Sequence, residues 1–198
     1  MIIDFPEIPL AIEVDRFADM TGLDREAAAA WLEIERSKLK AHGVFDEVAS
    51  ETLPELWESS ALSEIRSAII GLCALDIKDD RVGLPETSPD YRSVLNRLAL
   101  SDALDFLEYR VRIFLKPTGR EPGPRLIPGC PELPLIVNGI VLDHFGAGQS
   151  LGLALRQQEK IFSGPGLAFV YPIGSLTISF TSPCAKCARN DCPGRKGV

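Results

Sequence analysis

Apolar residues recur at intervals of three and four in three segments of the first 115 residues. This spacing places apolar side chains on one face of an α-helix, and it predicts helices over 25–41, 60–78 and 88–116. Thr21 and Asp24 are two possible N-caps for the first segment, and Gly43 is its expected stop signal. Ser88-Pro89 opens the third segment, in which Ser101-Asp102 is a possible second cap.

The end of the third predicted helix is apolar over more than half of its circumference. One stripe consists of Leu104, Leu107, Val111 and Phe114, and a second consists of Phe106, Tyr109 and Ile113. A helix of this kind is either central to a core or covered by another subunit. We therefore expect the protein to associate with itself or with protein partners.

The pattern changes after a segment that is dense in proline. Residues 116–134 contain six prolines and three glycines, which excludes a helix or a central strand. Beyond them, Asn138-Gly139 lies between two apolar triplets, which predicts a β-hairpin over 135–142. Further strands are expected at 167–171 and 176–180, with a turn at 172–174, while 151–162 fits either a strand or a helix.

These patterns predict an α+β fold, in which an N-terminal helical part precedes a small antiparallel β-rich module. The expected divisions are an acidic helical domain (1–115), a Pro/Gly-rich hinge (116–134), a β-rich module (135–182) and a cysteine-containing basic tail (183–198).

Charge is divided unevenly between the two halves of the chain. Residues 1–115 hold 23 of the 28 acidic residues and 12 of the 21 basic ones, a net charge of −11, whereas residues 116–198 carry +4. Opposite charges on two halves favour head-to-tail attraction between copies, or two different partner surfaces. The low pI of ≈ 4.9 argues against general binding of nucleic acid.

The cluster Cys184-x2-Cys187-x4-Cys192 carries the most specific chemistry in the sequence. Two cysteines separated by two residues can turn toward one ion, as in zinc and iron–sulfur sites. Three thiolates leave a tetrahedral site one ligand short. We predict Cys130 as the fourth ligand; Cys73, His144, His42 or a residue of a neighbouring subunit are the alternatives.

The expected metal is zinc, with an iron–sulfur cluster as the alternative and disulfides or free thiols as the third outcome. Cys192 stands where a zinc knuckle has its histidine, so the spacing resembles that motif only in part. Cys130 and Cys192 both precede proline, as in the Cys-Pro of one ferredoxin cysteine run, and this feature favours an iron–sulfur cluster.

The remaining cysteine and the two histidines have structural interpretations. Cys73 is expected to be a small core residue and His42 to lie at a helix end. His144 is expected to lie on a strand with a hydrogen bond to the backbone, and binding to a metal ion is the alternative.

The sequence contains no recognisable catalytic residue set. We therefore expect a non-enzymatic assembly or interaction subunit of a larger complex, such as a viral particle or multi-subunit machine, with a structural metal site in its tail. A small iron–sulfur or zinc protein with a redox or catalytic role is the alternative, and a nucleic-acid-associated factor using the basic tail is the third hypothesis. No segment reaches the length of an apolar membrane span, and the N-terminus does not resemble a signal peptide, so we expect a cytoplasmic protein or a particle assembled there.

Overall fold

The computed structural model describes residues 1–59, 61–77, 91–130, 132–146, 151, 153–156 and 161–174. A five-stranded antiparallel sheet has the order β1-β2-β3-β7-β4, and β5 and β6 form a separate hairpin. The strands are β1 (Ile3–Ile8), β2 (Leu39–Ala49), β3 (Ser67–Ile77), β4 (Glu121–Pro122), β5 (Leu155–Arg156), β6 (Ile161–Phe162) and β7 (Gly166–Gly174). The helices are α1 (Val14–Thr21), α2 (Arg25–Arg36), η1 (Pro54–Glu58), α3 (Tyr91–Leu115), η2 (Lys116–Thr118) and α4 (Val137–Phe145).

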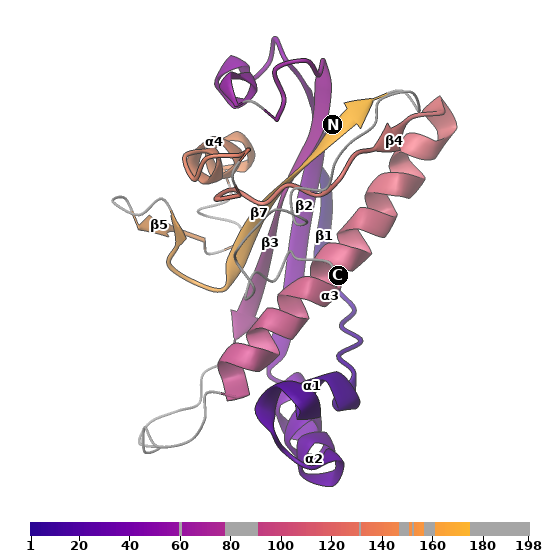
Figure 1. Cartoon of the computed structure of the whole chain (residues 1–198), viewed down its shortest axis with the longest axis vertical. Coiled ribbons are helices and arrows are strands. Elements are labelled where there is room, and N and C mark those ends of the chain that lie inside the picture. Colours follow the sequence, from indigo (N-terminus) through magenta and orange to yellow (C-terminus); the bar gives the residue numbers. More distant parts are fainter. Residues whose placement is uncertain are drawn as a thin grey trace.

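The predicted fold class is wrong, because the chain begins with a strand and has no separate helical half. Strands β1, β2 and β3 precede residue 116, and they join β4 and β7 from beyond it in the same sheet. In Figure 1, α3 runs along one face of this curled sheet, α4 lies on the other side, and α1 and α2 lie near one end. The described parts therefore form layers around one sheet, with helices on both of its faces.

The segment 60–78 was the clearest misreading, since most of it forms the central strand β3 instead of a helix. Alternate residues of β3 pack on opposite faces: Ile69 and Cys73 contact the core under α3, whereas Ile70 and Leu72 contact the core under α4. A strand buried on both faces is a continuous apolar run, and such a run also contains the three- and four-residue spacings of a helix.

The helix predicted over 25–41 stops at Arg36. Asp24 caps it as expected, accepting a hydrogen bond from Ala27 N–H at 2.9 Å. Strand β2 starts at Leu39, so Gly43 does not end a helix. Instead, a Cβ at position 43 would lie 2.7 Å from Leu107 Cδ1, and glycine therefore lets α3 approach the sheet closely.

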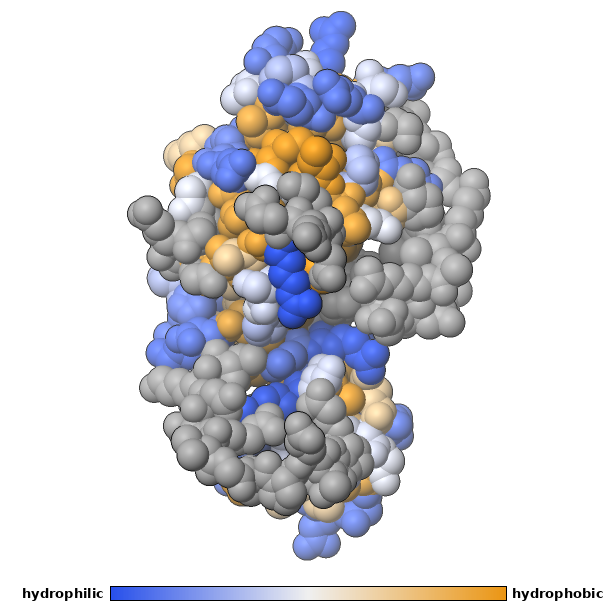
Figure 2. Space-filling model, turned by 90° about the vertical axis from the view of Figure 1, so that its left-hand side faces the viewer, coloured by the Kyte–Doolittle hydropathy of each residue, from blue (hydrophilic) through white to orange (hydrophobic). Residues whose placement is uncertain are grey.

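The predicted hairpin over 135–142 is also wrong, because Asn138 and Gly139 lie inside helix α4. Val137 and Val141 are fully buried one helical turn apart, in the core between α4 and the sheet. Tertiary packing of this pair outweighs the local turn preference of Asn-Gly. Figure 2 shows apolar side chains gathered on this side of the molecule. Leu135 and Ile136, which directly precede α4, are exposed.

The other local predictions had mixed outcomes. The third predicted helix corresponds to α3, and the strand predicted at 167–171 lies within β7. The turn predicted at 172–174 is wrong, since these residues continue β7. Residues 155–156 and 161–162 of the ambiguous segment form the short β5–β6 hairpin, and the strand predicted at 176–180 lies outside the described residues. None of the described helices combines the length and apolarity needed to cross a membrane.

Candidate functional site

Of the predicted metal ligands, the structure describes Cys130 alone; Cys184, Cys187 and Cys192 lie outside the described residues. Cys130 is half-buried in a turn, where its N–H donates to Ile127 O at 3.0 Å and its carbonyl accepts from Leu133 N–H at 3.1 Å. Burial raises the pKa of its thiol. Among the described side chains, no three of His, Cys, Asp or Glu are grouped as metal ligands would be. The four-cysteine site stays a prediction.

Cys73 lies in the core as expected, on β3, and burial raises the pKa of its thiol to about 12. Both histidine predictions are wrong. His42 lies on β2 opposite Ala74 instead of at a helix end, because the strand replaces the last turn of the predicted helix. His144 lies on α4, with Nε2 3.1 Å from Asp46 Oδ2, so its partner is a carboxylate and not the backbone.

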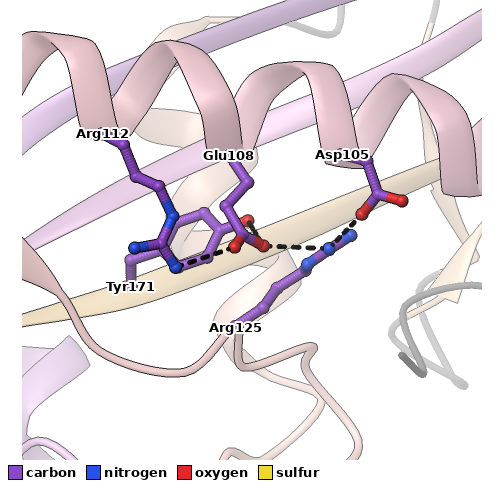
Figure 3. Close-up of polar contacts among 5 residues, drawn as sticks. All are labelled: Asp105, Glu108, Arg112, Arg125 and Tyr171. Atoms are coloured by element: carbon purple, nitrogen blue, oxygen red, sulfur yellow. Dashed lines mark hydrogen bonds and ion pairs between the residues drawn. The ribbon is translucent and has the colours of Figure 1, made fainter. Parts of the chain in front are cut away.

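A buried ion-pair network fastens α3 to β7 and to the loop after β4 (Figure 3). Arg125 Nη2 donates to Asp105 Oδ1 at 2.5 Å and to Glu108 Oε2 at 3.0 Å. The hydroxyl of Tyr171 donates to Glu108 Oε2 at 3.3 Å, and Arg112 Nη2 donates to Glu108 Oε1 at 3.0 Å. Three segments distant in sequence thus meet at one carboxylate.

The centre of this network is closed to solvent. The side chains of Arg125 and Glu108 are 3% and 9% exposed, whereas Arg112 and Asp105 are 52% and 57% exposed. Burial, together with the Glu108 carboxylate, raises the pKa of Tyr171 despite the opposing effect of Arg125, so its hydroxyl stays protonated and can donate. The network has no accessible reacting group at its centre, and we assign it to holding α3 in place.

A pocket of ≈ 510 Å³ lies beside the network, between α3 and the segment that leads from β1 into α1. Its charged lining consists of Glu13, Arg16, Asp102 and Asp105, and its apolar lining includes Ile12, Leu98 and Phe106. Asp105 belongs to both features, since it lines the pocket and also accepts from Arg125. We take this pocket as the candidate binding site.

Asp102 is partly buried in the wall of the pocket. Its Oδ2 accepts a hydrogen bond from Ala11 N–H at 3.1 Å. Burial raises the pKa of Asp102, and the nearby acids Asp105 and Glu13 raise it further, against the lowering effects of Ala11 N–H and Arg16. An acid with a raised folded-state pKa costs stability as pH rises from its unfolded pKa through its folded pKa. The negative charge of ionised Asp102 is therefore less favourable in the folded protein than in the unfolded chain.

Sequence reasoning missed every charged residue of the pocket and of the network. One signal was available: Asp102, Asp105 and Glu108 recur every three residues beside the apolar stripe of Leu104, Leu107 and Val111. Acids at that spacing share one helical face and need partners there. Nothing local indicates Arg125 as that partner, because it lies in the proline-rich segment 17 residues beyond Glu108.

Comparison of this chain with models of protein families and with curated proteins finds no match.

Proposed function

We propose that this protein is a non-enzymatic assembly or interaction subunit of a larger complex, and that it contacts a second copy of itself through the outer face of α3. The observation that carries the proposal is the apolar stripe of Tyr109 and Ile113. Their exposed fractions are 62% and 43%, on a helix whose opposite face is fully buried.

The stripe is continuous with a partly buried aromatic cluster. Phe106 packs edge-on against Phe5 of β1 with ring centroids 5.6 Å apart, and the guanidinium carbon of Arg110 lies 5.4 Å from the centroid of the Phe5 ring. Aromatic side chains and arginine are the residues most enriched in protein–protein interfaces. Tyr109 and Ile113 therefore lie next to the packed rings of Phe5 and Phe106.

The exposed edge strand β1 is a poorer contact for a second copy. Pro6 cannot donate a backbone hydrogen bond, and the pairing register of β1 shifts between Phe5 and Ile8. Asp4 and Glu7 add like charges that would face each other in a symmetric edge-to-edge pair. These features oppose strand addition, and they favour the helix face.

Charge does not drive this contact. Each copy carries a net charge of −7, which opposes long-range attraction between copies, so the proposed contact rests on the apolar side chains of α3. Salt screens this repulsion, and it is therefore not expected to weaken the association.

Replacing both Tyr109 and Ile113 with serine is expected to weaken self-association at least about tenfold, because truncating a central aromatic and its apolar neighbour removes well over 1.4 kcal/mol from a typical interface. The measurement is sedimentation velocity across a concentration series. Ile34→Ser is the matched control, since Ile34 is 61% exposed on α2, outside the stripe. Equal association constants for the double variant and the control would contradict the proposed contact.

We further propose that Cys130, Cys184, Cys187 and Cys192 bind a structural zinc ion, with an iron–sulfur cluster as the alternative occupant. Protein purified anaerobically is expected to contain about one zinc per chain. Cys187→Ser should abolish this metal content and lower the melting temperature, whereas Cys73→Ala should keep the metal. Visible absorption would identify the cluster instead, and fully reduced protein without stoichiometric metal would contradict both.

A further inference from the structure

The pocket beside α3 has an excess of negative charge. Glu13, Asp102 and Asp105 line it, and among the described residues that line it Arg16 is the one basic side chain. Glu13 directly precedes α1, and its side chain makes no capping hydrogen bond with that helix. Asp105 accepts a hydrogen bond from Arg125, but Arg125 also donates to Glu108. One positive charge is therefore shared between two carboxylates.

The carboxylates of the pocket are not arranged as the ligands of a metal ion. No group of three acids among the described residues is close enough together to hold a metal ion. A ligand that uses them must therefore be larger than an ion, with its charge spread over several hydrogen-bond donors or placed at the end of a stem.

The other walls are apolar. Leu98 and Ile12 are each 2% exposed, and Phe106 presents an aromatic ring between the pocket and Phe5. A binding site with apolar walls and a few polar groups selects a ligand that has a hydrocarbon part and one oriented polar end. The volume of ≈ 510 Å³ accommodates a small molecule of this kind or one long side chain.

We propose that this pocket binds an organic cation, a primary ammonium or guanidinium group carried on a hydrocarbon stem. The cation lies against Asp102 and Glu13, and the stem packs on Leu98 and Phe106. This binding site is separate from the contact proposed for Tyr109 and Ile113, and it adds a ligand to an assembly subunit. A free alkylamine and a lysine side chain of a partner protein both have this combination of a hydrocarbon stem and a terminal cation.

The proposal has a specific pH dependence. A bound cation favours the ionised form of Asp102, so binding strengthens as pH rises through the raised pKa of Asp102 and then becomes constant. Near that pKa, binding releases a proton. The charged groups that face Asp102 are Asp105, Glu13 and Arg16.

Titration calorimetry with n-pentylamine tests the site, with 1-pentanol as the uncharged probe. The amine is expected to bind the full-length protein at neutral pH and pentanol at least about tenfold more weakly. Asp102→Asn keeps an acceptor for Ala11 N–H, and it is expected to weaken amine binding about tenfold, as is Glu13→Gln. Asp19→Asn on the exposed surface of α1 is the matched control, and its binding should equal that of the unmodified protein.

Three results would overturn the proposal: no amine binding at millimolar concentration, equal binding of amine and pentanol, or equal losses in Asp102→Asn and Asp19→Asn. A short peptide containing one lysine distinguishes the two sources. Tighter binding of this peptide than of pentylamine assigns the pocket to a partner's side chain, and weaker binding assigns it to a free amine. The Tyr109 and Ile113 double variant should bind the amine normally, so failure of the self-contact and failure of the pocket are separable.

Discussion

Arg125→Ala is expected to lower the free energy of unfolding by about 3–5 kcal/mol, the usual cost of removing one partner from a buried ion pair. Arg125 is 3% exposed and its Nη2 bridges two carboxylates of α3. Without Arg125, the carboxylate of Glu108 remains buried, at 9% exposure, and it loses its most buried counterion. Chemical denaturation of the variant and of the unmodified protein measures the difference.

Arg112→Ala is the matched control, because Arg112 binds the other oxygen of the same Glu108 but is 52% exposed. Its loss should cost less than about 1 kcal/mol. If both arginine variants lost the same stability, Glu108 would not be anchored from the interior, and the network would not be what holds α3.

Gly71→Ala is expected to cost about 3 kcal/mol, at the upper end of typical overpacking penalties. Gly71 lies on β3 between Phe45 of β2 and Phe169 of β7. A Cβ at this position would lie 2.1 Å from Phe169 Cζ and 2.6 Å from the carbonyl oxygen of Val44. The ring can turn aside, but the carbonyl belongs to the backbone of β2 and cannot move without bending the sheet.

Gly164→Ala is the control, since a Cβ there meets nothing within 4 Å. It should change the free energy of unfolding by less than about 0.5 kcal/mol. Replacing the ring as well, in the double variant Gly71→Ala/Phe169→Leu, should not restore stability, because the close contact between the new Cβ and the carbonyl oxygen of Val44 remains. A Gly71→Ala protein as stable as the Gly164→Ala control would show that the three central strands are packed differently.

Local pattern was sufficient for some elements and not for others. Helix α3 was predictable because its length and its buried stripe of Leu104, Leu107 and Val111 agree with the pattern. The expected cap at Ser88-Pro89 lies outside the described residues. Strand β3 was not, since burial on both faces erases the alternation that identifies a strand. Helix α4 was mispredicted as a hairpin because of its Asn-Gly pair. The turn preference of that pair stabilises a hairpin less than the burial of Val137 and Val141 stabilises the helix.

The candidate site shows the same division between local and non-local information. The regular spacing of the acids of α3 could be recognised in the sequence, but the partners of Glu108, Arg125 and Tyr171, lie 17 and 63 residues beyond it. The pocket depends on how the segment before α1 crosses α3, and no motif in either segment encodes that crossing. The cysteine pattern, by contrast, is legible in the sequence, and three of its four members lie outside the described residues.

Sedimentation equilibrium of the unmodified protein, at low and high salt, tests most directly whether this chain is an assembly subunit. We expect association at micromolar concentration, with an association constant that does not fall as salt is raised, because the contact is apolar and salt screens the repulsion between copies that each carry −7. A monomer at every salt concentration, up to about 100 μM protein, would contradict assembly through self-contact, because an affinity weaker than that corresponds to less than about 5.5 kcal/mol.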